Sequence, residues 1–264
     1  MKKIFLTFII LMLSLFSINA QVVNEGDPAI ANIFKGQEAI SDHTYSADLL
    51  LEQKLRRFNP DIFKPNAKGK YVLDFNHLKG SPYEKNTFSF GHVTDEISNK
   101  SVNLYLRYNI YNDEIELKAS LQPNEKTIAL LKKHDISCVI NGRFYKYASF
   151  NNEKNKTKDG YLIEIYKGKN YNLYKRLTST FTPKKIPKNS YSQIELATFD
   201  TKVTYYLQKG NSITYLSNKK KILLREFNNN FAAKNILRNK GSKLKKENDF
   251  LQFVKSLDTS VVYN

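Results

Sequence analysis

Three carboxylates beside one arginine are the residues of this chain whose types and spacing come nearest to an active site. Asp113, Glu114 and Glu116 follow Arg107 within the stretch LRYNIYNDEIELKAS. Paired carboxylates cleave glycosidic bonds when they lie about 5 Å or about 6.5 to 9.5 Å apart and one of them has its pKa raised in a pocket. Positions i and i+2 on a strand come near that separation, so Glu114 and Glu116 would satisfy the distance.

The surrounding sequence supplies no sign of such a pocket. The chain lacks tryptophan, on which sugar-binding sites commonly stack their substrate. Charge pairing of Arg107 with the two glutamates across neighbouring strands explains the same pattern on a solvated sheet face. We therefore expect no catalytic residue here, and a change of less than about 1 kcal/mol in the free energy of unfolding for Glu114→Gln or Glu116→Gln.

Other kinds of site are not indicated either. The four histidines, at positions 43, 77, 92 and 134, form no HxxxH or HxH pair, and a single cysteine excludes CxxC and an internal disulfide. Cys138 stands in register with Ile140 on a predicted strand and is expected to be a buried core thiol. The chain has no GxSxG elbow, no P-loop and no GxGxxG motif. The sequence therefore predicts no metal site, no cofactor and no enzymatic activity.

A series of hairpins is predicted to carry these residues. Between Val102 and Ile110 apolar side chains occupy every even position, the period of a strand with one buried face. Asn112–Asp113 and Asn141–Gly142 supply turn chemistry. The predicted hairpins join 102–110 to 114–118, 138–140 to 144–150, 161–166 to 171–177, and 203–207 to 213–216. This succession indicates an α+β, mainly β fold with an antiparallel meander sheet, curved or partly barrel-like, and with C-terminal helices.

The N-terminal part is less regular. Residues 1–20 have the form of a signal peptide, in which Lys2 and Lys3 precede the uncharged apolar run from Ile4 to Phe16. That run is shorter than the roughly 20 residues that span a bilayer. No cysteine lies near the expected cleavage site after Ala20. The sequence predicts a protein that is exported through a signal peptide, periplasmic or extracellular, and not lipidated.

The rest of the chain is expected to divide into three parts. Residues 21–68 form an irregular N-terminal segment with a short helix from Ser46 to Phe58. Residues 69–217 form the antiparallel β-meander domain, which begins with strands at 70–75 and 88–93 joined by a turn at 80–82. Residues 218–264 form a basic helical segment packed on the same domain.

This C-terminal segment is the most basic part of the chain. Helices are expected at 218–227, capped by Asn218, at 231–239 and at 249–257. Between residues 218 and 249, ten Lys or Arg stand against three Asp or Glu. The cations that form a candidate surface for a polyanion or a membrane are Lys219, Lys220, Lys221, Arg225, Lys234, Arg238, Lys243, Lys245 and Lys246. A solvated outer face of packed helices is the other explanation.

The whole chain carries a formal net charge of +17. Such a balance favours an anionic partner, but 35 of the 42 basic residues are lysines, whereas recognition of bases and phosphates favours arginine. AT-rich coding would produce the same excess of lysine. The sequence therefore argues against nucleic acid as the partner and leaves open a peripheral contact with an anionic membrane surface.

Four motifs resemble a family of exported proteins, without an assigned activity, from Bacteroidetes-type bacteria. They are GSPY at 80–83, FGHV at 90–93, LRYNIYNDEIE at 106–116 and NGRF at 141–144. The resemblance spans about residue 70 to the end of the chain, and it implies no catalytic residue.

These observations favour an exported, non-catalytic cell-envelope binding or accessory protein with an unidentified envelope partner. Two alternatives stay open. A curved sheet closed by helices could enclose an apolar ligand, as in a periplasmic carrier of a lipid. A hydrolase would need convergent polar groups in a cleft that the sequence does not reveal.

Overall fold

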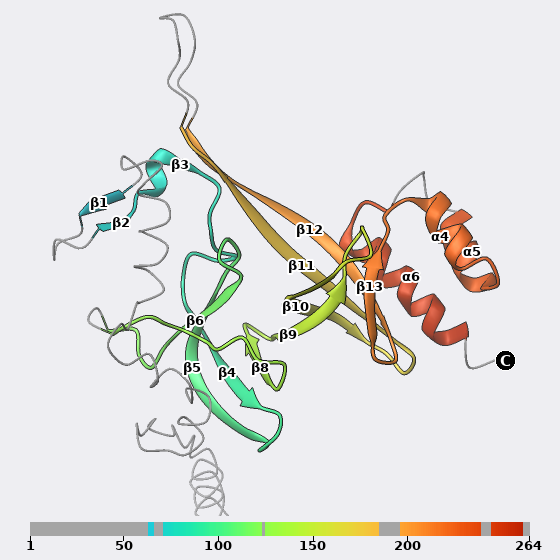
Figure 1. The fold of residues 1–264 in the computed structure, drawn as a ribbon, viewed down its shortest axis with the longest axis horizontal. Coiled ribbons are helices and arrows are strands. Elements are labelled where there is room, and N and C mark those ends of the chain that lie inside the picture. Colours follow the sequence, from blue (N-terminus) through green and yellow to red (C-terminus); the bar gives the residue numbers. More distant parts are fainter. Residues whose placement is uncertain (1–62, 66–70, 123–124, 185–195, 239–243, 261–264) are drawn as a thin grey trace, which may run out of the picture.

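The computed structural model describes residues 63–65, 71–122, 125–184, 196–238 and 244–260, and this part of the chain is mainly β with helices near its C-terminal end (Figure 1). The predicted fold class is therefore confirmed. The strands are β1 (Phe63–Pro65), β2 (Tyr71–Leu73), β3 (Leu78–Lys79), β4 (Ser89–Asp95), β5 (Lys100–Asn109), β6 (Glu114–Lys118), β7 (Ile128–Ala129), β8 (Ile136–Ile140), β9 (Arg143–Asn151), β10 (Thr157–Lys167), β11 (Tyr171–Thr182), β12 (Ala197–Lys209) and β13 (Ser212–Leu216). The helices are the 3-10 turn η3 (Phe75–His77), α4 (Lys220–Glu226), α5 (Phe231–Arg238) and α6 (Glu247–Ser260). The predicted signal peptide and the predicted helix from Ser46 to Phe58 lie outside the described residues.

All four predicted hairpins form. The pairs β5–β6, β8–β9, β10–β11 and β12–β13 are antiparallel. Three of the four turns use residues that tolerate a left-handed backbone, with φ of 55° at Asp113, 56° at Asn141, 75° at Gly142 and 56° at Gly210. Turn chemistry and strand alternation were therefore sufficient to predict these pairs.

Gly142→Ala should lower the free energy of unfolding by about 1 kcal/mol. A Cβ at this position would meet nothing within 4 Å, so the loss arises from the positive φ alone. Urea unfolding measures the loss, and Gly142→Asn should recover part of it because asparagine tolerates this backbone region. A loss of several kcal/mol would mean that the β8–β9 turn packs against another part of the chain.

Strands β9 to β13 close into a five-stranded ring. β10 pairs with β9 and β11, β11 with β12, and β12 with β13, and Asn151 at the end of β9 pairs with Thr214 of β13. Each of these strands contributes one buried side chain to a single cluster, which consists of Phe150, Leu162, Tyr174, Tyr206 and Ile213. The sheet is therefore partly barrel-like, and side chains occupy the inside of its ring.

The other half of the sheet is an open layer in the order β9-β8-β4-β5-β6-β7. It departs from a simple meander, because β4 lies between β5 and β8 and pairs with both. Its inner face carries a core cluster that includes Leu104 and Leu106 of β5, Ile115 of β6 and Cys138 of β8. The alternation predicted for residues 102–110 thus identified the buried face correctly.

The structure does not join residues 70–75 to residues 88–93 as one hairpin. β2 pairs with β1 instead, and η3 and β3 follow it. The Asp74 carboxylate accepts a hydrogen bond from the backbone N–H of Asn76 at 3.2 Å and contacts the His77 ring at 3.0 Å, so the chain turns directly after β2. β4 therefore pairs with β5 and β8 rather than with β2.

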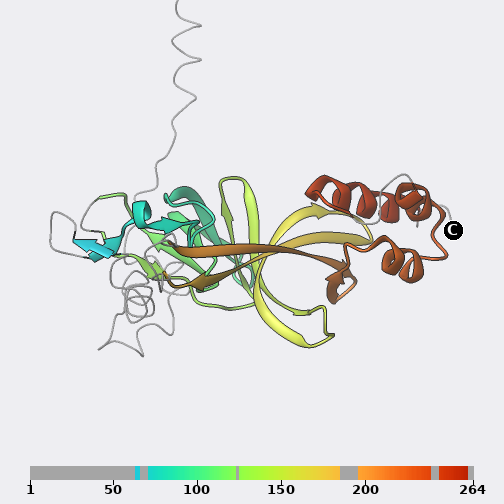
Figure 2. The same ribbon diagram turned by 90° about the horizontal axis from the view of Figure 1, so that it is seen from above.

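The helices α4, α5 and α6 lie at one end of the molecule, beyond the ring (Figure 2). Phe250, Phe253 and Leu257 of α6 share one buried cluster with Leu173 of β11 and Leu207 of β12. The apolar stripe predicted for residues 249–257 therefore docks on the sheet, as expected for an amphipathic helix.

One carboxylate anchors α6 to the β10–β11 turn. Asp258, which is 7% exposed, accepts hydrogen bonds from the backbone N–H groups of Lys169 at 2.9 Å, Asn170 at 2.6 Å and Tyr171 at 3.1 Å, and from the hydroxyl of Tyr166 at 2.9 Å. Burial by itself raises the pKa of Asp258, but these hydrogen bonds outweigh burial and lower the pKa below its usual value. The helical segment is thus held on the sheet by a long-range polar contact as well as by its apolar face.

Candidate functional site

Asp113, Glu114 and Glu116, the three carboxylates that the sequence offered as candidate catalytic residues, each contact a different partner in the structure. One oxygen of the fully buried Glu116 accepts hydrogen bonds from Nε of Arg107 at 2.9 Å and Nη2 at 2.5 Å, and the other accepts one from Nδ2 of Asn109 at 2.8 Å. The rings of Tyr83 and Phe88 cover the Arg107 guanidinium, with centroids at 3.7 and 4.3 Å. The prediction that Arg107 and Glu116 lie on a solvated face is therefore wrong, because aromatic side chains cover this part of the sheet.

Asp113 binds a different arginine. Its Oδ2 accepts a hydrogen bond from Nη2 of Arg176 at 2.8 Å, and its Oδ1 accepts one from the hydroxyl of Tyr108 at 2.7 Å. Arg176 also donates to the carbonyl of Tyr161 at 3.2 Å. Because Arg176 belongs to β11, this ion pair ties the β5–β6 turn of the open layer to the ring.

Glu114 is the most weakly held of the three carboxylates. Its Oε1 lies 3.7 Å from Nζ of Lys132, and its side chain is 17% exposed. Glu114 and Glu116 belong to the same face of β6, as predicted, but both oxygens of Glu116 bind groups of the protein and none of that side chain is exposed. This geometry gives no support for glycoside cleavage by the two glutamates.

A small polar pocket lies next to the Arg107 network. It holds about 100 Å³, and Glu84, Arg143 and Tyr145 contribute to its lining. The Glu84 carboxylate accepts hydrogen bonds from Nη1 of Arg143 at 2.7 Å and from the hydroxyl of Tyr145. A carrier of a lipid-sized ligand needs roughly 300 to 1,000 Å³. This pocket is therefore too small for a lipid-sized ligand, and it is lined by residues of the open layer and its loops rather than by residues between the sheet and the helices, where a carrier would enclose its ligand.

The cysteine considered as a reactive residue is buried, and two of the histidines considered as metal ligands each contact a single carboxylate. Cys138 is 1% exposed, and burial raises the pKa of its thiol, so the predicted core position is confirmed. His77 contacts Asp74 at 3.0 Å, and His134 lies 3.6 Å from Asp159. Within the described ranges, no three His, Cys, Asp or Glu side chains gather closely enough to hold a metal ion.

Eight of the nine cations of the candidate surface lie in the described helical segment, and the ninth, Lys243, lies outside the described residues. The other eight are called the basic surface from here on: Lys219, Lys220, Lys221, Arg225, Lys234, Arg238, Lys245 and Lys246. The first helix begins one residue later than predicted, because Lys219 rather than Asn218 is the N-cap of α4.

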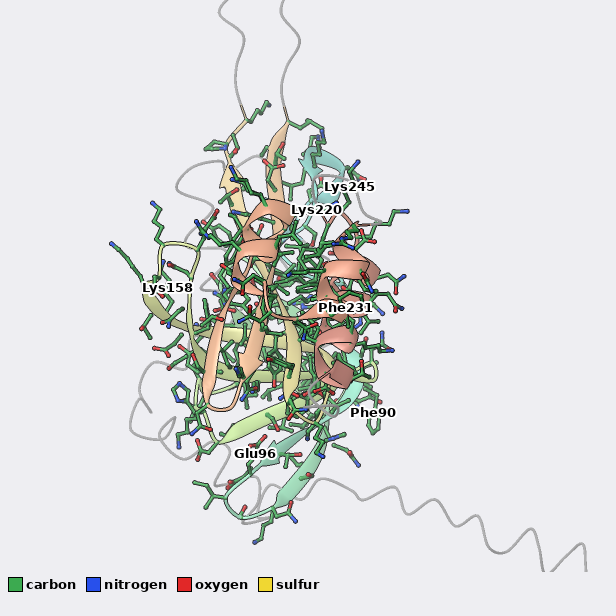
Figure 3. The ribbon with its side chains drawn as sticks, turned by 90° about the vertical axis from the view of Figure 1, so that its right-hand side faces the viewer. Phe90, Glu96, Lys158, Lys220, Phe231 and Lys245 are labelled. Atoms are coloured by element: carbon green, nitrogen blue, oxygen red, sulfur yellow. The ribbon has the colours of Figure 1, made fainter. Side chains whose placement is uncertain are left out.

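Contacts between the helix ends bring the basic surface together. The carbonyl of Asn218 accepts a hydrogen bond from the N–H of Leu244 at 2.8 Å, which places the start of α4 beside the lysines that precede α6. Nζ of Lys220 donates to the carbonyl of Arg238 at 3.3 Å, so the end of α5 also lies beside the start of α4. Lys220 and Lys245 accordingly lie on the same side of the helical end in Figure 3.

The outward face of α5 adds a residue that the sequence did not single out. Ala233 and Leu237 are buried in the helical core, whereas Phe231, Lys234 and Arg238 lie at i, i+3 and i+7 on the opposite side of the helix. Phe231 is 73% exposed. The spacing of Phe231 with the two cations was visible in the sequence, but an aromatic at the start of a predicted helix is more often part of a core.

The acidic side chains of the helical segment are largely used in structural contacts. Glu247 accepts a hydrogen bond from Nζ of Lys175 at 2.9 Å, Asp249 accepts bonds at 3.0 Å from two backbone N–H groups just before α6, and Asp258 holds the β10–β11 turn. Burial raises the pKa of Glu226. Within the described residues, the cations of the basic surface other than Lys220 have no ion-pair partner.

In comparisons with protein families, curated proteins and solved structures, nothing matches this chain. The resemblance to exported proteins of Bacteroidetes-type bacteria therefore stays a prediction. The described helices include none that is long and apolar enough to cross a membrane.

Proposed function

We propose that the protein is an exported, non-catalytic binding protein of the cell envelope and that the basic surface contacts an anionic envelope component. The observation that carries this proposal is a run of three lysines, Lys219–Lys221, at the N-terminal end of α4, whose first turn has no acidic residue. The helix dipole disfavours each such cation by about 0.3 to 1 kcal/mol at low ionic strength. Residues that are unfavourable for the stability of their own helix are expected at functional sites, where binding rather than stability selects them.

A bias toward lysine in the coding sequence accounts less well for this surface. Such a bias places lysines without regard to their neighbours, and around the β9–β10 turn Lys154, Lys156 and Lys158 stand close in sequence to Glu153 and Asp159. In the helical segment Glu247, Asp249 and Asp258 make structural contacts instead. Glu226 is an exposed acidic neighbour of Arg225. Uncompensated positive charge on one end of the molecule attracts an anionic partner at long range.

Charge reversal of Lys219, Lys220 and Lys221 to glutamate should abolish binding of the protein to isolated bacterial envelopes at low salt. The free energy of unfolding should fall by no more than about 1 kcal/mol, because the preference of glutamate for a helix N-terminus offsets the lost hydrogen bond from Lys220 to the carbonyl of Arg238. Co-sedimentation at low salt and at about 1 M salt, where charge interactions are screened within about 3 Å, measures the binding.

The matched control is reversal of Lys154, Lys156 and Lys158, which changes the net charge equally at a different edge of the molecule, where Figure 3 labels Lys158. This control should keep most of the binding. Equal loss in both triple variants would show that net charge governs binding rather than the basic surface. No binding by the unmodified protein at low salt would contradict the proposed function itself.

A further inference from the structure

We propose that the partner of the basic surface is a bilayer containing anionic phospholipid and that Phe231 enters its headgroup region. This inference rests on the proposed envelope-binding function and names the class of partner. It is carried by the arrangement of an exposed aromatic side chain among cations on the outward faces of α4 and α5.

The helices α4 and α5 run past each other in opposite directions. The bond from Nζ of Lys220 to the carbonyl of Arg238 joins the start of α4 to the end of α5. The connection between the two helices is short: Arg225 in the last turn of α4 precedes Phe231, the first residue of α5, by a few positions. Phe231 therefore has Lys234 one turn further along α5, and the exposed Arg225 stands near the end of the preceding helix.

Both helices turn these residues away from the protein core. Leu223 of α4 and Leu237 of α5 are buried in the same cluster, which also includes side chains of α6. Lys221 and Arg225, at i and i+4, are exposed on α4, as Phe231 is on α5. In Figure 3 Phe231 is labelled below Lys220 and Lys245, at the same helical end of the molecule.

The local backbone holds Phe231 in this position. Oδ1 of Asn230 accepts a hydrogen bond from the N–H of Ala233 at 2.8 Å, and the carbonyl of Asn230 accepts one from the N–H of Lys234 at 3.1 Å. Asn230 thus caps α5, and Phe231 is its first residue. The phenyl ring stands at a helix end, where it can enter a surface without displacing the rest of the helix.

An aromatic residue among lysines distinguishes a lipid surface from a soluble polyanion. Cations alone suffice for a soluble polyanion, whereas a peripheral membrane site combines cations with an apolar side chain that inserts at the headgroup boundary. Each lysine near an anionic bilayer strengthens binding by about fivefold, and a single apolar anchor is too weak to act without such charges. The basic surface and Phe231 together supply both requirements.

Phe90 supplies a matched comparison for Phe231. It is 61% exposed, but it lies on β4, and its ring meets Tyr105 edge-on at 5.6 Å. The outer sheet face around Phe90 does not include the basic surface. The two phenylalanines thus expose similar apolar area in different electrostatic surroundings.

The absence of tryptophan from the chain makes a direct test available, because Phe231→Trp and Phe90→Trp each introduce a single fluorescent reporter. The chain from Gln21 onward is mixed with vesicles of phosphatidylcholine alone or of phosphatidylcholine with phosphatidylglycerol. With the anionic vesicles, the emission of Phe231→Trp should shift to shorter wavelength and be quenched by brominated acyl chains, whereas the emission of Phe90→Trp should not change. Phe231→Ser should reduce vesicle binding about tenfold, and Phe90→Ser should leave it unchanged.

Three results would overturn the inference. Binding to anionic vesicles with the Phe231→Trp emission unchanged would mean that charge alone holds the protein, so Phe231 does not insert. Binding to soluble polyphosphate without binding to vesicles would identify a non-lipid polyanion as partner and leave the proposed function standing. Failure to bind either probe or isolated envelopes would contradict both proposals.

Discussion

Replacement of Asp258 by alanine should lower the free energy of unfolding by about 3 kcal/mol. The carboxylate accepts hydrogen bonds from three consecutive backbone N–H groups at residues 169–171 and from the hydroxyl of Tyr166. Alanine leaves the N–H of Tyr171 without an acceptor at a buried position and the other three donors without their acceptor at partly buried ones. The turn wraps closely around the carboxylate, since a Cβ on Gly168 would lie 2.3 Å from Oδ2 of Asp258. Urea unfolding followed by circular dichroism measures the loss.

The same carboxylate makes stability depend on pH. Burial raises the pKa of Asp258, but the hydrogen bonds from the turn lower it further than burial raises it. A carboxylate whose pKa is depressed in the folded state contributes stability above its unfolded-state pKa and loses that contribution as the pH falls through the folded-state value. The difference in unfolding free energy between the unmodified protein and Asp258→Asn should therefore be largest at neutral pH and shrink below about pH 4.

Asp200→Ala is the matched control, because Asp200 is an exposed aspartate on β12 whose loss should change stability by less than about 0.5 kcal/mol. Hydrogen exchange adds a local readout: the amides of residues 169–171 should exchange faster in Asp258→Asn and unchanged in Asp200→Ala. If Asp258→Ala and Asp200→Ala unfold at the same urea concentration, the contact between α6 and the β10–β11 turn does not stabilise the fold.

Replacement of Glu116 by alanine should lower the free energy of unfolding by about 3 to 5 kcal/mol as well. The side chain of Glu116 is 0% exposed and that of Arg107 is 11% exposed, so alanine leaves a covered guanidinium without its charge partner. Glu116→Gln keeps an acceptor oxygen and should cost about 2 kcal/mol. This value replaces the loss of less than about 1 kcal/mol that a solvated position would have predicted.

Glu114→Gln is the control for this pair, since its partner Lys132 lies at 3.7 Å and both side chains are partly exposed. It should change the free energy of unfolding by less than about 1 kcal/mol. A double-mutant cycle with Arg107→Ala isolates the ion pair, and the double variant should be more stable than the sum of the single losses predicts. Strictly additive losses would mean that Arg107 and Glu116 stabilise the fold independently.

Local chemistry was enough to predict the hairpins and the helical face that docks on the sheet. Asp113, Asn141 and Gly142 adopt the left-handed backbone that short turns require, and strand alternation identifies the buried side of β5. The cations of the basic surface could also be predicted, because a charge excess is visible in composition. Each of these features depends on residues close together in the chain.

Long-range neighbours could not be predicted in this way. β4 lies between β5 and β8, Asn151 meets Thr214 to close the ring, and Asp113 binds Arg176 across 63 residues. The strands share the same alternation, so their pattern cannot specify which edges pair. That choice depends on closing long loops and on packing a common core.

The sequence by itself determined that the chain forms β-hairpins followed by basic helices, because turn residues and apolar periods act over a few residues. Only the tertiary structure decided which polar and apolar groups are buried. Tyr83 and Phe88 cover the guanidinium of Arg107, which pairs with the buried Glu116, whereas the charges of the two residues alone predicted a solvent-exposed position. Phe231, which the sequence did not single out, stays exposed beside Lys234, because the buried side of α5 is the one that carries Ala233 and Leu237. Whether a residue is buried depends on which distant parts of the chain pack over it, and the whole fold determines that packing.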